Sequence, residues 1–167
     1  MTTLYTEMKS PLGTLQLTAE DGALTGVHFP GQRHDRPRQP GWRRADDEEV
    51  LARARRELGE YFEGRRRRFD LALDPRGTPF QRAVWQALLQ VPFGATSTYG
   101  AIARAVGRPS AVRAVGAAVG ANPIGIIVPC HRIIGRDGTL TGYAGGLDRK
   151  AKLLALESHA ANFELAA

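Results

Sequence analysis

The chain has almost no cysteine and no long hydrophobic run. Cys130 is the single cysteine among 167 residues, so neither an internal disulfide nor a cysteine-based zinc cluster can form. No apolar run approaches the roughly 20 residues that cross a bilayer, and the first residues lack the basic and apolar regions of a secretory signal. These features predict a globular protein of the cytoplasm without a membrane partner.

Sequence motifs for common cofactors are absent as well. There is no internal repeat and no Walker A motif, and the glycines of residues 142–146 lack the strand and helix of a dinucleotide fingerprint. Residues 1–75 contain no cysteine and only two histidines, His28 and His34. We therefore expect neither a cofactor nor a metal.

Excess positive charge is confined to the second half. Residues 1–75 carry 13 Lys plus Arg and 13 Asp plus Glu, whereas residues 76–167 carry 10 and 4. The net charge of +6 therefore lies in the half that contains Cys130. A concentrated positive field favours a polyanionic partner, although a solvated surface with a chance asymmetry would give the same count.

The first half has the pattern of a small sheet with one helix. Residues 3–10, 13–20 and 23–30 alternate apolar and polar side chains between turn residues, which predicts three strands. Residues 47–62 predict a helix, and residues 69–74 one more strand. The apolar face of the helix consists of Leu51, Ala54, Leu58 and Phe62.

After residue 76 the pattern becomes helical. Thr78 and Gln81 have the spacing of a capping box. Short helices are predicted over 99–106 and 111–121, with Ser110 as the N-cap of the second. Two short helices joined by a Gly-Pro turn are typical of a helix-turn-helix.

The remaining chain contains the cysteine. Residues 124–128 predict a buried strand-like segment, residues 136–146 a glycine-rich loop, and residues 147–157 a last helix with Leu147, Ala151 and Leu154 on its apolar face. The whole pattern predicts an α+β protein. A small sheet domain with a helix would span residues 1–75, and a mostly helical domain with the helix-turn-helix and Cys130 would span residues 76–167.

The helix over 111–121 carries little side-chain bulk, because alanine and glycine predominate. Small residues let a helix approach another surface closely, and packing inside a protein is the commoner use of that property. Arg113 projects from among them, and arginine is the usual probe of a nucleic-acid groove. This residue favours a contact with nucleic acid.

His131 follows Cys130 directly. A thiol has an ordinary pKa of about 8.5 and becomes a useful nucleophile when a base or a positive charge favours the thiolate. Neighbouring side chains of an extended segment point to opposite faces, so a water or a turn at Pro129 would have to connect the two residues. Glu157, which ends an apolar helix, is one of four downstream carboxylates that could orient the histidine. On these residues alone, an inert core thiol stays the commoner alternative.

A longer motif surrounds this pair, the run GANPIGIIVPCHRIIGRDGTLTGYAGGLDRKAKLLALE. It resembles the active-site region of the O6-alkylguanine-DNA alkyltransferases, the methylated-DNA–protein-cysteine S-methyltransferases, and PCHR is the signature of that family. The upstream run TPFQRAVWQALLQVPFGATSTYGAIARAVGRPSAVRAVGAAVG is similar to the helix-turn-helix region of the same family. The resemblance covers residues 76–157, whereas the first half is similar only in the order of its elements.

This resemblance implies repair of double-stranded DNA by irreversible, stoichiometric transfer of the alkyl group of O6-alkylguanine to Cys130. The protein would act once, as a monomer without a cofactor. His131 would be the base, acting through a water, and Glu157 would orient it. Tyr99 would give a proton to the leaving guanine, and Asn122 would be the hinge between the recognition helix and the active-site segment.

The resemblance also implies how the lesion is reached. The recognition helix would enter the minor groove, and Arg113 would fill the gap left by a flipped nucleotide. Further DNA contacts would come from Ser110, Ala111, Ala114 and Gly116. The base pocket would be lined by Val128, Pro129, Tyr143 and Ala144.

Two other functions fit parts of the sequence. A non-catalytic alkyltransferase-like protein binds the lesion only, but such proteins lack the acceptor cysteine. A cysteine hydrolase built on Cys130, His131 and Glu157 would leave the helix-turn-helix and the basic second half unexplained. The range of alkyl groups, repair of O4-alkylthymine and cooperative binding to DNA stay open at this point.

Overall fold

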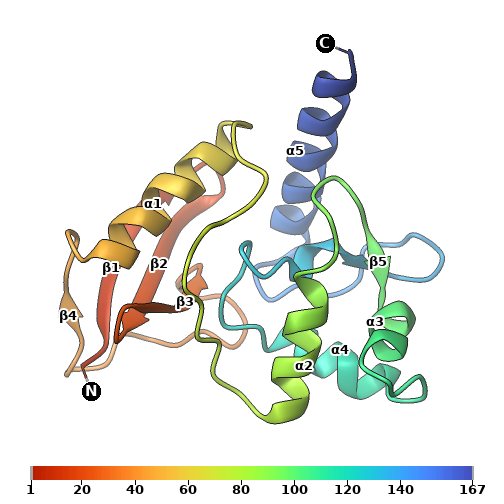
Figure 1. Ribbon diagram of the computed structural model, residues 1–167, viewed down its shortest axis with the longest axis horizontal. Helices are drawn as coiled ribbons and strands as arrows, with labels where there is room; N and C mark the ends of the chain where they lie inside the picture. The colour runs from red at the N-terminus through yellow and green to blue at the C-terminus, as the bar shows by residue number, and fades with distance from the viewer. Residues whose placement is uncertain (1, 167) are drawn as a thin grey trace.

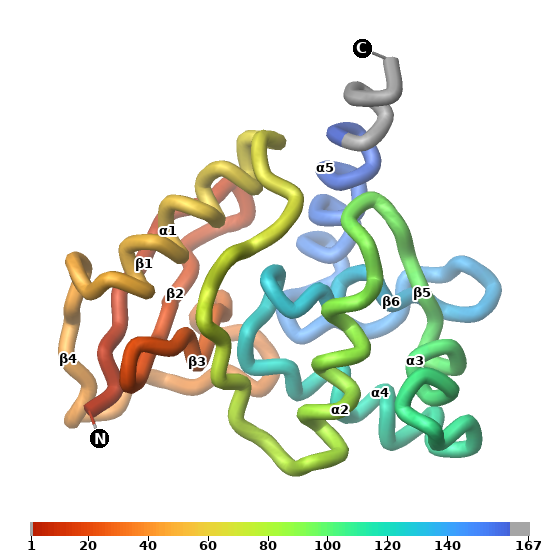
Figure 2. The backbone as a smooth tube through the Cα atoms, viewed as in Figure 1, coloured from red at the N-terminus to blue at the C-terminus, as the bar shows by residue number. Residues whose placement is uncertain are grey.

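The structure, a computed structural model, describes residues 2–166, with side chains up to residue 160. The chain forms two lobes that lie side by side (Figure 1). A sheet with one helix makes up the first lobe, and helices around a two-stranded sheet make up the second. Figure 2 shows the chain passing between the lobes after the helix α1. This mixed α+β architecture confirms the predicted fold class.

The sheet of the first lobe is an antiparallel meander with one added strand. Its order is β3 (Ala23–His28), β2 (Gly13–Glu20), β1 (Leu4–Ser10) and β4 (Arg43–Arg44), and β4 pairs in parallel with β1. Asp21 and Gly22 link β2 to β3 with φ angles of 51° and 77°. Positive φ at both central residues is what a type I′ hairpin turn requires. The three predicted strands are thus confirmed.

Helix α1 (Glu49–Phe62) packs on this sheet. Glu48 caps it, because its carboxylate accepts hydrogen bonds from two backbone N–H groups of the first turn. Leu51, Ala54 and Leu58 are fully buried, as their spacing predicted, whereas Phe62 is half-buried.

The second lobe contains four helices and a short sheet. Its helices are α2 (Pro79–Leu88), α3 (Tyr99–Ala105), α4 (Val112–Gly120) and α5 (Leu147–Ala166). Strand β5 (Ser97–Thr98) pairs in parallel with β6 (Ile133–Ile134), and a 3-10 helix, Cys130–Arg132, precedes β6. The capping box of Thr78 and Gln81 is formed as predicted. Trp85 donates from Nε1 to the carbonyl of Ala118 at 2.8 Å, which holds α2 against α4.

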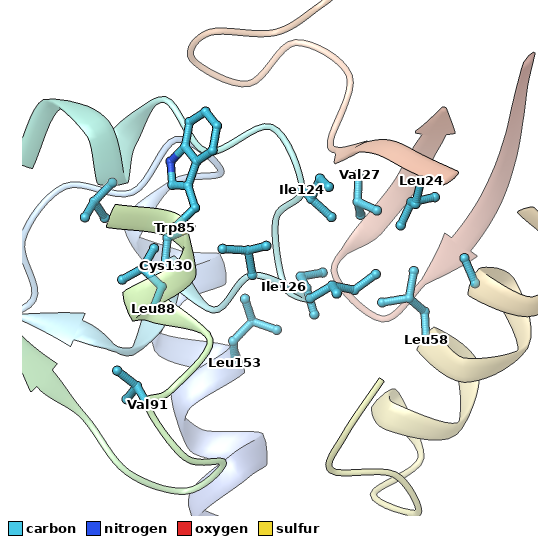
Figure 3. Packing of buried hydrophobic residues seen from close by; sticks show 14 of the residues in the cluster. Leu24, Val27, Leu58, Trp85, Leu88, Val91, Ile124, Ile126, Cys130 and Leu153 are labelled. Carbon is cyan, nitrogen blue, oxygen red and sulfur yellow. The ribbon is translucent and has the colours of Figure 1, made fainter. Parts of the chain in front are cut away.

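One hydrophobic core continues through both lobes. In Figure 3, Leu24, Val27 and Leu58 lie on one side, and Trp85, Leu88 and Cys130 lie on the other. Val27 also donates to the carbonyl of Pro123 and accepts from the N–H of Gly125, each at 3.0 Å. The segment that leads to Cys130 is therefore anchored on β3. Within residues 2–166, no helix has the length and hydrophobicity to cross a bilayer.

Two predicted strands are wrong. Residues 69–74 form a single parallel bridge to β3, in which Leu24 donates to the carbonyl of Ala72 and accepts from the N–H of Asp74, each at 2.8 Å. The N–H of Asp70 donates instead to the Glu57 carboxylate, also at 2.8 Å. Residues 124–128 are mostly buried as predicted but not extended, since Ile126 has a φ of 71° and reverses the chain.

Two helix predictions also need correction. Ser110 does not cap α4, because the helix begins at Val112 after Ala111, without a side-chain cap. The predicted apolar face of the last helix is wrong, because Leu147 is 47% exposed and Ala151 is exposed. The buried face of α5 consists of Lys150, Leu153 and Glu157.

Candidate active site

Cys130 lies at the start of the 3-10 helix and is 7% exposed. Its N–H donates to the carbonyl of Val128 at 2.8 Å, and the chain turns at Pro129 instead of running on extended. In this 3-10 turn, unlike in an extended segment, neighbouring side chains do not have to point to opposite faces. Cys130 and His131 can therefore belong to one site.

Asn122 holds the segment before Cys130 in shape. It lies just after α4, donates from Nδ2 to the carbonyl of Val128 at 2.8 Å, and accepts at Oδ1 from the N–H of Ile124 at 3.0 Å. Burial raises the pKa of the Cys130 thiol, while a hydrogen bond from Asn122 and the positive charge of Lys150 oppose this rise. The resting sulfur is therefore a thiol and needs a base.

His131 and Glu157 form a buried pair. Nε2 of His131 lies 2.7 Å from Oε2 of Glu157, and both side chains are at most 1% exposed. Burial alone would raise the pKa of Glu157, but the hydrogen bonds from His131 and Arg132, together with the positive charge of Arg132, outweigh it and lower this pKa to about 2. An ionised carboxylate only accepts hydrogen bonds, so Nε2 carries the proton.

The other ring nitrogen is then the basic one. Among the described residues, Nδ1 of His131 is buried without a hydrogen-bond partner. Burial lowers the pKa of His131, although Glu157 opposes this, so the ring is neutral near neutral pH. A neutral histidine with a free lone pair at Nδ1 can take a proton.

Three buried residues around this pair were not identified from the sequence. Arg132 donates from Nε to Oε1 of Glu157 at 2.8 Å and from Nη2 to Oε2 at 3.1 Å. The hydroxyl of Tyr61 on α1 donates a hydrogen bond to the same Oε2 at 2.6 Å.

Lys150 is fully buried and donates hydrogen bonds to the backbone carbonyls of Ile133 and Thr141. Arg132 could have been suspected from its place beside His131, but nothing local marks Tyr61.

Tyr99 is linked to the Cys130 segment by the backbone pairing of the short sheet. It directly follows β5, which pairs with β6, and β6 directly follows the 3-10 helix of Cys130. The hydroxyl of Tyr99 lies 2.8 Å from Oγ1 of Thr141 in the glycine-rich loop. Gly116 faces the Tyr99 ring, since a Cβ there would meet it at 3.9 Å.

A small cleft opens at the thiol. Its volume is about 10 Å³, close to the space that one water molecule needs. Cys130 lines it together with Tyr143 and Ala144 from the glycine-rich loop and with Phe29 from the first lobe. The other two predicted pocket residues do not line this cleft: Val128 is fully buried, and Pro129 lines a separate groove of about 540 Å³ beside Phe93.

The outer side of α4 faces solvent. Arg113 and Ala114 are exposed there, as is Ser110 before the helix, whereas Ala111 is half-buried. The opposite side packs into the lobe through Val115, Ala118 and Val119. Small residues with one projecting arginine are thus presented outward, which suits close contact with a groove. Within the described residues, no group of three or more His, Cys, Asp or Glu side chains is arranged to bind a metal.

Comparison with known proteins gives a consistent result. The family model described as "6-O-methylguanine DNA methyltransferase, ribonuclease-like domain" matches residues 3–75, and the one described as "6-O-methylguanine DNA methyltransferase, DNA binding domain" matches residues 79–159. A methylated-DNA–protein-cysteine methyltransferase of Mycolicibacterium paratuberculosis is 50% identical over 153 residues, which is 92% of this chain and 91% of that protein.

Solved structures of O6-methylguanine methyltransferases are also similar to this chain. The crystal structure of the Mycobacterium tuberculosis O6-methylguanine methyltransferase is 46% identical with a TM-score of 0.86, and the match covers 95% of this chain and 94% of that one. A structure of the M. tuberculosis protein in complex with DNA is 45% identical with a TM-score of 0.86, covering 94% of each chain.

Proposed function

The chain belongs to the 6-O-methylguanine DNA methyltransferase family, and on this premise we propose that it repairs DNA by moving the alkyl group of O6-alkylguanine in a duplex to Cys130. The transfer is direct, irreversible and stoichiometric, so each molecule acts once. One observation carries the proposal. The buried Cys130 thiol is followed by His131, and Nε2 of this histidine is hydrogen-bonded to the ionised carboxylate of Glu157.

Different residues act on the bond that forms at the alkyl carbon and on the bond that breaks. Nδ1 of His131 takes the thiol proton through a water, and Glu157 stabilises the imidazolium. The sulfur then attacks the alkyl carbon, the bond from that carbon to O6 breaks, and its electrons stay on the guanine. The Tyr99 phenol gives the guanine ring a proton, and both Tyr99 and His131 afterwards exchange protons with solvent. The thioether is stable, so Cys130 is not regenerated.

The lesion must leave the helix to reach the thiol. Flipping a nucleotide costs a few kcal/mol, and Arg113 on the exposed side of α4 replaces the lost stacking in the minor groove. Ser110, Ala111 and Ala114 lie at the same helix end, where backbone N–H groups suit a phosphate. Gly116 is half-buried on the same helix, and its lack of a side chain lets the helix backbone approach the groove closely. The cleft of about 10 Å³ is far below the roughly 300 Å³ of a typical ligand pocket, so the loop of Tyr143 moves when a base enters.

The same proposal covers the organisation of the chain. Residues 1–75 form a support domain, and residues 76–167 form the domain that binds DNA and accepts the alkyl group, with α3 and α4 as its helix-turn-helix. The protein acts as a monomer in the cytoplasm. The two stretches matched by the family models support the division.

Intact mass measures the reaction directly. After incubation with a duplex carrying one O6-methylguanine, we expect a gain of about 14 Da, the mass of one CH₂, located on Cys130, with no second turnover. The matched control is Cys130→Ser, which should gain no mass. Transfer by that variant, or many turnovers by the wild type, would contradict the proposal.

A further inference from the structure

Tyr61 connects the first lobe to the proton relay of the second. It lies on α1, 96 residues before Glu157, and its hydroxyl donates to Oε2 of Glu157 at 2.6 Å. The same oxygen lies 2.7 Å from Nε2 of His131. We propose that Tyr61 is a positioning residue for the alkyl transfer: its phenol fixes the Glu157 carboxylate and shares the charge of the oxygen that holds His131.

The tyrosine is held firmly in this position. It is fully buried, and its ring lies 5.4 Å from Phe62, 5.7 Å from Phe69 and 6.1 Å from Phe93, measured between centroids. Three aromatic neighbours on both lobes fix the ring plane and therefore the direction of the hydroxyl. Helix α1 consequently presents its phenol to Glu157 in one orientation.

Packing alone does not require the hydroxyl. A buried hydroxyl costs free energy unless it is hydrogen-bonded, and a phenylalanine would make the same ring contacts. Burial, followed by the charge of Glu157, raises the pKa of Tyr61, so the phenol keeps its proton and can only donate to the carboxylate. The hydroxyl therefore acts on Glu157, and through Glu157 on His131.

Sharing one oxygen makes the two donors interdependent. When Tyr61 donates to Oε2, less negative charge is left to stabilise a protonated His131. Removing the hydroxyl concentrates that charge on the bond to Nε2, so His131 should take up a proton at higher pH. The other groups that face this pair are Arg132 and Cys130 from the 3-10 helix, Lys150 from α5 and Tyr143 from the loop. Each of them is unchanged when only the phenol is removed.

The experiment compares Tyr61→Phe with wild type and with Tyr5→Phe, which removes another hydroxyl from the first lobe. The first readout is the NMR titration of the His131 ring, assigned among the four histidines by its loss in His131→Gln. The second is the rate of methyl transfer in a single turnover as a function of pH. We expect the His131 midpoint and the acidic limb of the rate to move up by about half a pH unit or more. The limiting rate should fall about tenfold, because Glu157 is less firmly held.

The two readouts separate this inference from the proposed function, on which it rests. A wild type that gains no methyl group refutes the function, whereas the NMR titration still tests the link to His131. An unchanged His131 midpoint in Tyr61→Phe refutes the link, even if transfer is slower, because a slower rate alone would also follow from a small shift of the site that leaves the charge on Glu157 unchanged. If Tyr61→Phe does not fold, 3-fluorotyrosine at this position keeps the ring and makes the phenol a stronger donor. The midpoint should then move down, and no movement would overturn the proposal.

Discussion

Replacing Glu157 with glutamine tests the electrostatics of the buried network. Glu157 is 1% exposed, and its pKa falls from 4.5 to about 2 in the folded protein. A shift of this size stabilises the fold by about 3 kcal/mol at neutral pH, because one pKa unit corresponds to about 1.4 kcal/mol. Glu157→Gln also leaves the guanidinium of Arg132 buried without its counter-charge. We therefore expect a loss of at least about 3 kcal/mol in the free energy of unfolding.

Urea denaturation, followed by the fluorescence of the buried Trp85, measures this loss. A carboxylate with a lowered pKa stabilises the fold above its unfolded-state pKa and loses that effect as pH falls through its folded-state pKa. The difference between wild type and Glu157→Gln should hold between pH 7 and 5 and shrink to about 1 kcal/mol at pH 3. The control adds Arg132→Met, which should recover part of the loss because no buried charge remains unpaired. A difference below about 0.5 kcal/mol at pH 7, or one that does not change down to pH 3, would show that the ionised Glu157 carboxylate does not stabilise the fold.

Two further substitutions test the approach to the lesion and the segment before the thiol. Arg113→Ala should slow methyl transfer from a duplex more than tenfold while leaving transfer from free O6-methylguanine base nearly unchanged, as measured with labelled substrates; equal losses on both would contradict a role in flipping. Asn122→Ala leaves the Ile124 N–H without its partner and the Val128 carbonyl with only the Cys130 N–H, and it should lower the free energy of unfolding by about 1–3 kcal/mol. A change below about 0.5 kcal/mol in urea denaturation would show that those hydrogen bonds are replaced.

Features fixed by neighbouring residues could be predicted from the sequence. The capping box of Thr78 and Gln81 involves residues three apart, and the turn at Asp21 and Gly22 depends on their own φ angles. The pair of His131 and Glu157 was also identified, although its members are 26 residues apart, because the PCHR motif and the last helix resemble a known family. Local chemistry and family resemblance therefore account for most of what was correct.

The errors arise where tertiary contacts override the local pattern. The run of β-branched residues at 124–128 predicts a strand, but its backbone bonds to Val27 on β3 and reverses at Ile126. On α5, the inward position is taken by Lys150, since its ammonium group can bond to the carbonyls of Ile133 and Thr141. Tyr61 could not be assigned at all, because its partner is 96 residues away and belongs to the other lobe. Pairings of this kind appear only in the folded chain.

The narrow cleft at Cys130 also protects the thiol before the protein meets any DNA. Oxidants and small electrophiles react with exposed thiolates, and their reaction slows as a thiol becomes buried and its pKa rises. Cys130 is 7% exposed, and burial raises its pKa. The cleft therefore keeps Cys130 in its reduced form. If Cys130 accepts a single alkyl group, as proposed, the same burial also extends the time for which each unused molecule stays active.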